Sequence, residues 1–543
     1  MVFARRSTTL LAAIVASCAM VLSLTACTSD NKTVVDGQTT VTSNSAGGVA
    51  VFTPSDGITL NQQTPLNKWA KLVPDLAKAL ADAGFKKGDI DHTTSDSLAK
   101  QSRAIQDFVV DHLSNNTTDD SGIAIAPDNM TLLVAPVVEA DASTRQYGDY
   151  VSQNLSTNDA TDGEATSDGE SSEDDSSKDD SSNTESDSTA SDEQAQAVDR
   201  LVSSLKLAKE SGMHVVLLGN SIEGYKPDAF VKFSDAQTIG KLQAEKMVSK
   251  LKLDKASKDN PKYIEVLLPY TAVDEKGNAN DSTFAQEAFR GIWQVLGSYY
   301  QKGVVESPSG TWDGKSTEND WQAVAYDAAK EGSTAKVLDK RLAKTDGQST
   351  LTRIDGIITM NDYIASEVVK ELDDLGYTGS AADINPQITI SGIVGNITGK
   401  KDLSRDAVPD PIKSPENDNA NDSSSSDDDA DKDTSASDKD RDSQWPLVTG
   451  YGAYVSNIPS IVNGKQWMTG MEDRQTIATD IAQACAKLNK DEALNSMPSI
   501  RNSEVGGVKK IPTINEPLLA VSAGNLKSAL IDPGYISLAD AGL

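Results

Sequence analysis

Short runs of β-branched and other apolar residues alternate along this chain with longer stretches in which apolar residues recur every three or four positions. The short runs are typical of buried strands and the longer stretches of amphipathic helices, so their alternation predicts βα units and parallel sheets. The predicted strands are residues 49–52, 122–125, 131–137, 215–218, 263–268, 354–359, 387–391 and 447–450. These strands and the helices between them predict an α/β fold with two doubly wound parallel-sheet lobes.

The predicted helices lie between these strands. In the first of them, Trp69, Leu72, Val73, Leu76 and Leu80 follow the helical period, and a glycine at position 84 ends the helix where glycine is favoured. A length of 543 residues also exceeds what one compact core usually holds, which agrees with two lobes. The other predicted helices are residues 195–212, 237–251, 283–296, 321–331, 363–376 and 475–488.

Two acidic tracts interrupt this pattern. Residues 159–193 contain 14 acidic side chains and one lysine, and residues 416–442 contain 11 acidic and three basic side chains, so together they carry −21 of the net charge of −31. Because they lack apolar periodicity, we expect two disordered insertions at the surface, residues 158–193 and 403–443. Loose calcium binding or repulsion of cell-wall polyanions is the functional alternative. The remaining charge, about −10, is ordinary for a surface and predicts no binding to nucleic acid.

The N-terminus has the features of a secretion signal. Arg5 and Arg6 precede an apolar run of 15 residues at 10–24, which is short for a membrane-spanning helix but typical of a signal-peptide core. The run ends in Leu-Thr-Ala before Cys27 and resembles the lipobox of bacterial lipoproteins. We therefore expect a signal peptide at 1–26, a lipid on Cys27 that anchors an extracytoplasmic protein to the cell membrane, and a flexible tether at 27–48. A plain signal peptide that happens to contain a cysteine is the alternative.

Motifs for catalysis or metal binding are missing from the sequence. With Cys18 removed and Cys27 lipidated, Cys485 would have no partner for a disulfide. No G-x-S-x-G motif occurs, and the glycines before Lys400 have the wrong spacing for a phosphate-binding loop. We therefore expect no enzymatic activity and no cofactor or metal. No transition-metal spacing connects the three histidines, His92, His112 and His214.

Several short motifs, taken in order, resemble the sugar-binding proteins of bacterial ABC importers, in particular the xylose-binding and multiple-sugar-binding branch. The likeness runs from about residue 49 to the C-terminus and leaves out the acidic tracts. No single motif carries it alone. The motifs are residues 212–218, 230–235 and 239–243, then Met360-Asn361-Asp362, then 461–469, and finally 511–512, 516–517, 525–526 and 532–535.

This resemblance implies the type I periplasmic-binding-protein fold, in which three crossovers join two lobes and the ligand binds in a cleft that closes by hinge motion. We expect the N-terminal lobe to comprise residues 49–235 and 472–507, and the C-terminal lobe residues 236–471 and 508–543. The resemblance also implies a monomer whose partners are a sugar or sugar-like ligand and the permease of an ABC transporter.

The resemblance further implies which side chains contact the ligand. For Asn361 and Asp362, and for Asn280 and Asp281, helix capping is the alternative, because asparagine and aspartate are also favoured N-cap residues. For Trp69 the alternative is packing in the core. The complete set of expected ligand contacts is Asn361, Asp362, Trp69, Asn220, Asn280, Asp281, Trp312, Asp313 and Tyr451.

The sequence also departs from the family pattern. Gly219-Asn220 stands where the family has Asp-Arg, so the guanidinium that grips sugar oxygens is missing. Tyr451-Gly452 stands where the family has Gln-Asp, so the expected hinge carboxylate is missing too. The first hypothesis is a solute-binding lipoprotein that delivers a sugar to a permease. The alternative is a ligand-sensing or interaction lipoprotein that keeps the fold but has lost tight sugar binding.

Overall fold

The structure is a computed structural model, and it divides the chain into two units, Met1–Asn44 and Ser45–Leu543. In the first unit, β1 (Lys32–Val35) and β2 (Gln38–Val41) form an antiparallel hairpin within the stretch expected to be a tether. Outside the described residues lie the predicted signal peptide, Cys27, the predicted strand 387–391, nearly all of the predicted strand 122–125 and most of both acidic insertions. The described residues are 32–35, 38–41, 46–55, 65–115, 125–138, 145–151, 153–156, 185–273, 280–343, 351–381 and 443–543.

The N-terminal lobe of the second unit is built on a seven-stranded sheet with the order β17-β18-β9-β7-β5-β3-β4. The five strands from β9 to β4 are parallel, and their order corresponds to the 2-1-3-4-5 order of doubly wound folds. β18 continues the sheet in parallel with β9, and β17 pairs antiparallel with β18. The strands are β3 (Gly48–Pro54), β4 (Ile90–Ser95), β5 (Met130–Val134), β7 (His214–Leu218), β9 (Ala229–Lys232), β17 (Ile500–Val505) and β18 (Val508–Asn515).

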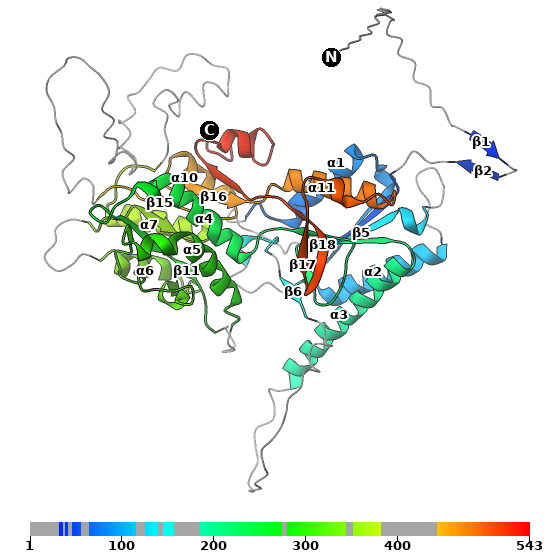
Figure 1. The fold of residues 1–543 in the computed structure, drawn as a ribbon, viewed down its shortest axis with the longest axis horizontal. Coiled ribbons are helices and arrows are strands. Elements are labelled where there is room, and N and C mark those ends of the chain that lie inside the picture. Colours follow the sequence, from blue (N-terminus) through cyan, green and yellow to red (C-terminus); the bar gives the residue numbers. More distant parts are fainter. Residues whose placement is uncertain are drawn as a thin grey trace, which may run out of the picture. The chain divides into compact units, whose positions relative to one another are not determined.

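Helices cover both faces of this sheet (Figure 1): α1 (Trp69–Asp82) and α11 (Arg474–Leu488) on one face, α2 (Leu98–Asn115) and α3 (Glu185–Glu210) on the other. Successive side chains of a strand point to opposite faces, and β5 follows this rule. Leu133 is buried with α1 and α11, whereas Leu132 and Val134 are buried with α2 and α3. A strand that is buried on both sides explains the continuous apolar run in the sequence.

The C-terminal lobe repeats this design with a four-stranded parallel sheet in the order β12-β10-β14-β15. α4 packs against α5, and α6 against α7. The elements of the lobe are α4 (Ala236–Leu251), β10 (Lys262–Val266), α5 (Thr283–Gln301), β12 (Val305–Glu306), α6 (Ser333–Arg341), β14 (Gly356–Ile358), α7 (Asp362–Leu375) and β15 (Leu447–Val448). Shorter paired strands are β6 (Asn154–Leu155) with β8 (Ser221–Ile222), β11 (Leu268–Pro269) with β13 (Ala325–Tyr326), and β16 (Met468–Met471) with β19 (Leu519–Ser522).

The chain passes between the lobes three times. It crosses from β9 to α4, from β16 to α11, and from β18 to β19. The predicted α/β class with parallel-sheet cores is confirmed. Among the helices of the described residues, none is both long enough and apolar enough to cross a membrane.

The structure corrects the predicted lobe boundary near the C-terminus. Residues 508–515, expected in the C-terminal lobe, form β18 of the N-terminal sheet, with Thr513 paired to Phe230. The reason is local, because Ile511 and Ile514 are buried in the two apolar clusters of that sheet.

One predicted helix is also corrected. The helix expected at 321–331 does not form, because Ala325 and Tyr326 pair with β11 and the α-helix begins only at Ser333. α3 (Glu185–Glu210) begins within the first expected insertion, residues 158–193.

Candidate functional site

Residues that follow the strands of both sheets are joined by hydrogen bonds at the junction of the lobes. Ser234 follows β9 and Tyr451 follows β15, and their hydroxyl oxygens lie 2.5 Å apart. Glu472, on the second crossing, accepts from the Ser234 backbone N–H at 2.7 Å and from the Tyr451 hydroxyl at 3.1 Å. Burial raises the pKa of Glu472 to about 7, and burial together with Glu472 raises the pKa of Tyr451 well above 10. This hinge cluster, Ser234, Tyr451 and Glu472, therefore ties two crossings to each other.

Asn361 stands at the N-terminus of α7 and makes two different contacts. Its Oδ1 accepts from the backbone N–H of Ile364 at 2.9 Å, which is the N-cap interaction. Its Nδ2 donates to Oε1 of Gln146 at 3.0 Å. Capping thus uses the oxygen, while the amide nitrogen reaches a residue from the N-terminal lobe.

Asp362 is buried inside the C-terminal lobe. Its Oδ1 accepts from Gln466 at 2.6 Å, and its Oδ2 accepts from the Tyr454 backbone N–H at 2.9 Å and from the Thr469 hydroxyl at 2.8 Å. Burial raises the pKa of Asp362 to about 6, although these hydrogen bonds oppose the increase. The carboxylate that we expected at the ligand instead joins α7 to the segment around β16.

In the N-terminal lobe, Trp69 and Asn220 are also engaged within the protein. Trp69 is 3% exposed and packs edge-on against Tyr150 at 5.0 Å and Phe233 at 5.6 Å between ring centres. Asn220 donates to the Pro136 carbonyl at 2.9 Å and accepts from the Gln153 backbone N–H at 3.0 Å. Trp69 therefore contacts Tyr150, and Asn220 contacts Gln153.

Residues 145–151, which we call the interlobe segment, connect these groups. The Tyr147 ring lies 4.7 Å from that of Phe284 and 6.3 Å from that of Tyr451, between ring centres. The Tyr454 hydroxyl donates to the Gln146 carbonyl at 2.6 Å. The Tyr150 ring stacks on Phe233 at 4.8 Å. The segment therefore contacts both lobes where their strands end.

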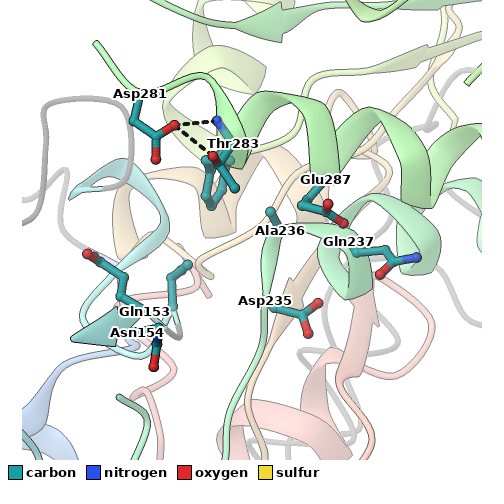
Figure 2. Close-up of a pocket in the computed structure, with 10 residues that line it drawn as sticks. Gln153, Asn154, Asp235, Ala236, Gln237, Asp281, Thr283 and Glu287 are labelled. Atoms are coloured by element: carbon teal, nitrogen blue, oxygen red, sulfur yellow. Dashed lines mark hydrogen bonds between the residues drawn. The ribbon is translucent and has the colours of Figure 1, made fainter. Parts of the chain in front are cut away.

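A cavity of about 430 Å³ adjoins this segment (Figure 2). Val151, the last residue of the segment, and Phe284 form apolar parts of its wall. Of the nine expected ligand contacts, Asp281 lines this cavity, and its carboxylate accepts from the N–H and the hydroxyl of Thr283. The lining residues are Val151, Gln153, Asn154, Asp235, Ala236, Gln237, Asp281, Thr283, Phe284 and Glu287.

The lining favours a neutral or cationic ligand. It contains three carboxylates and three carboxamides, and none of its described residues is a lysine or arginine. Burial alone would raise the pKa of Asp235, but hydrogen bonds from Lys232 and Thr238 outweigh it and lower that pKa, so the group is ionised at neutral pH. Carboxamides and carboxylates supply the donors and acceptors that hydroxyl groups need, whereas these lining residues offer an anion no cationic partner.

The structure does not bring the remaining expected contacts to this cavity. Asn280 uses its amide to donate to the Thr271 carbonyl at 2.9 Å. Trp312 is 2% exposed and belongs to an aromatic cluster with Phe289, Trp293 and Tyr300. Asp313 is exposed and its carboxylate accepts from the backbone N–H of Lys315 at 2.7 Å.

Sequence reasoning did not identify Gln146, Tyr147, Tyr150 and Glu472. The missing hinge carboxylate was sought next to Tyr451, whereas Glu472 lies 21 positions later and reaches the same hydroxyl. The tyrosines of the interlobe segment had no apolar periodicity around them. The one signal in the sequence that could have identified these tyrosines is that two aromatic residues occur in a polar stretch before an acidic tract.

Comparison with protein-family models and with curated proteins finds no match. Among solved structures, similar chains include an ABC transporter solute-binding protein from Clostridium phytofermentans with bound β-D-glucose (17% identity, TM-score 0.44, covering 91% of this chain and 99% of the other). A carbohydrate transporter solute-binding protein from Chloroflexus aurantiacus in complex with D-glucose has 18% identity and a TM-score of 0.43, covering 92% and 98%. A sugar ABC transporter protein from Actinomyces odontolyticus has 10% identity and a TM-score of 0.43, covering 89% and 97%.

Proposed function

We propose that this chain is an extracytoplasmic solute-binding lipoprotein that captures a neutral, hydroxyl-rich solute such as a sugar between its lobes. The observation that carries the proposal is the polar cavity lined by residues from both lobes, Gln153 and Asn154 on one side and Asp281 and Thr283 on the other (Figure 2). Two parallel-sheet lobes with three crossings can open and close around such a site, and closure excludes water from the bound solute.

The further parts of the proposal concern delivery and location. A carrier of this kind releases its solute to a membrane protein, and we propose an ABC-transporter permease as that partner of a monomeric binding protein. A lipid on Cys27 would keep the carrier at the outer face of the cell membrane. Replacing Cys27 by serine should release the protein into the medium, and membrane retention of the variant with persistent lipid labelling would contradict the anchor.

The solute class can be tested by thermal unfolding with D-glucose and D-glucuronate. A bound ligand at a hundred times its Kd stabilises a protein by about 2.7 kcal/mol, so binding is visible as a higher Tm. We expect D-glucose to raise Tm and D-glucuronate to leave it unchanged, because the cavity is lined by carboxylates. An equal increase with the sugar acid would contradict the assigned class.

A matched pair of variants locates the binding site. Asp281 and Asp313 each accept a hydrogen bond from the backbone N–H two residues later, but Asp281 lines the cavity and Asp313 does not. Asp281→Ala should weaken D-glucose binding by about 1.5–3 kcal/mol, the usual range for a hydrogen bond to a charged group, whereas Asp313→Ala should leave it unchanged. Isothermal titration calorimetry measures both, and equal affinities for the two variants would place the site elsewhere.

A sensing or interaction lipoprotein without tight sugar binding is the second candidate. The observation that favours it is the interlobe segment, which contacts Asn361, Tyr451 and the aromatic pair Trp69 and Phe233 in place of a ligand. The thermal experiment separates the two candidates, because a carrier requires a solute that shifts Tm.

A further inference from the structure

The interlobe segment contacts residues of both lobes at the ends of their strands. Tyr147 and Tyr150 are 0% and 1% exposed, so the segment is buried and does not rest on the surface. It contacts residues that follow β9, β14 and β15, and ligands of open α/β sheets bind at these carboxyl ends. Three of the residues expected to contact ligand are covered by it: Asn361, Tyr451 and Trp69.

The contacts of the segment are also of the kind that a sugar would make. The carboxamide of Gln146 accepts a hydrogen bond from Asn361, as a hydroxyl oxygen could. The Tyr150 ring stacks on Phe233 at 4.8 Å between ring centres, where the flat face of a sugar could lie. The same protein groups are therefore suited to either occupant.

The cavity and the segment share a wall. Val151 lines the cavity, and Phe284 lines it as well while packing against Tyr147. If residues 146–151 moved away, the cavity would extend past Phe284 toward Asn361 and Tyr451. The solute site would then include residues from the strand ends of both lobes.

One tight contact holds the segment close to the N-terminal lobe. Gly148 has φ +98°, and a Cβ placed there would lie 2.6 Å from the carbonyl oxygen and 2.7 Å from the Cβ of Asn67. The adjacent Asp149 accepts from Lys68 at 2.8 Å, and its backbone N–H donates to the Asn67 carbonyl at 2.8 Å. A residue larger than glycine at position 148 would push the segment out of this place, because the contact is with backbone atoms.

We propose that residues 145–151 form an intramolecular plug that occupies the part of the solute site beyond Phe284, so that solute fills the whole site only in the fraction of molecules whose plug has moved away. The identification of the competing ligand as a sugar rests on the proposed function, whereas the existence of a displaceable plug does not. In this scheme the measured Kd equals the intrinsic Kd divided by the unplugged fraction. A variant that weakens the plug should therefore bind solute more tightly than the natural chain.

The first experiment measures plug opening without any solute. Asn361→Cys is made in the otherwise natural chain, with Gly148→Ala and with Gly224→Ala, and iodoacetamide labelling of residue 361 is followed by peptide mass spectrometry. Gly224 is the matched control, because its φ is +69° and a Cβ there meets nothing within 4 Å. We expect labelling about tenfold faster or more with Gly148→Ala, and an unchanged rate with Gly224→Ala.

Equal labelling rates in the three proteins would overturn the plug. Should Gly148→Ala prevent folding, Tyr147→Ala gives the same test, because it removes the ring that packs between Phe284 and Tyr451. Far-UV circular dichroism and a cooperative unfolding transition establish that each variant is folded before labelling.

The second experiment uses D-glucose as the probe in calorimetry with the natural chain, Gly148→Ala and Gly224→Ala. Tighter binding by Gly148→Ala alone supports competition between plug and sugar. Equal or weaker binding by Gly148→Ala, in a variant whose residue 361 labels faster, overturns the competition. Faster labelling without glucose binding in any of the proteins supports the displaceable plug and counts against the proposed sugar site, so the two failures are distinguishable.

Discussion

The two lobes have the same order of strands, but different kinds of side chain cover the carboxyl ends of these strands. In the N-terminal lobe, Trp69, Tyr150 and Phe233 pack together, so this end is aromatic. In the C-terminal lobe, Asp362 gathers hydrogen bonds from Gln466 and other donors, so this end is a buried polar network. Topology therefore positions a site in both lobes, while side chains alone decide what each half contributes.

The difference also separates the responses of the lobes to pH. An aromatic cluster has no group that titrates near neutrality, and its stability depends on apolar burial. The polar network and the hinge contain Asp362 and Glu472, whose pKa values burial raises to about 6 and about 7. Variants in the two lobes should thus lower the free energy of unfolding by different amounts and with different pH dependence.

The largest effect is expected from removing the aromatic platform. Trp69→Ala should lower the free energy of unfolding by about 3–5 kcal/mol, because it leaves a cavity beneath Tyr150 and Phe233. Urea unfolding at several pH values measures it, and the loss should be the same at each pH. Trp69→Phe, which keeps an aromatic ring, is the control and should cost less. A loss of unfolding free energy that changes with pH would contradict the proposal that the two lobes respond differently to pH.

A somewhat smaller loss of stability is expected from breaking the buried polar network of the C-terminal lobe. Asp362→Ala should lower the free energy of unfolding by about 3 kcal/mol, because it leaves the Tyr454 N–H and the Thr469 hydroxyl without this acceptor. Asp373→Ala is the matched control on the same helix, since its exposed salt bridge with Lys465 should contribute less than about 1 kcal/mol. Similar losses for both variants in urea unfolding would show that the buried network adds no stability.

The hinge should make stability fall as pH rises. Burial raises the pKa of Glu472 from 4.5 to about 7, so the folded chain holds this proton in a window where the unfolded chain has released it. The contribution is complete below pH 4.5 and is lost as pH rises through about 7. Compared with Glu472→Gln, the natural chain should lose about 3 kcal/mol between pH 4 and 8. A difference between the two proteins that stays constant over this range would contradict the assignment.

The smallest effect is expected at the cap of α7. Asn361→Ala should cost about 1 kcal/mol, because the backbone N–H of Ile364 loses its acceptor. Asn361→Ser keeps a capping oxygen but not the amide that reaches Gln146, so most of the stability should return. Thermal unfolding of the two variants compares these contributions, and an equal loss in both would indicate that the bond to Gln146 matters more than the cap.

The sequence predicted the parts of the fold that follow from local periodicity. Strands such as β7 and helices such as α7 were predicted to within a few residues, because continuous apolar runs and helical spacing report burial directly. It did not predict β18, since two adjacent exposed lysines and Pro512 interrupt the apolar residues of this strand and give a weak signal. The helix expected at 321–331 was wrong because pairing with β11 overrode the local pattern.

The candidate site was predictable only in part. Asp281 follows from the resemblance and lines the cavity, and Asn361 lies at the expected strand end. The expectation for Asp362 could not foresee that Gln466 and Thr469, more than 100 positions later, would take both its oxygens. A residue type shows which bonds are possible, but the three-dimensional neighbours decide which bonds are made.

The hairpin of β17 and β18 changes which strand forms the border of the N-terminal sheet. Without it, the border would be β9, whose sequence Ala-Phe-Val-Lys is mostly apolar and buried. With it, the border is β17, which carries Arg501 and Glu504 and has an irregular register near Ser503. Charged side chains and irregular register oppose strand addition by a second chain. The hairpin therefore protects the protein against edge-to-edge aggregation with other copies of the chain.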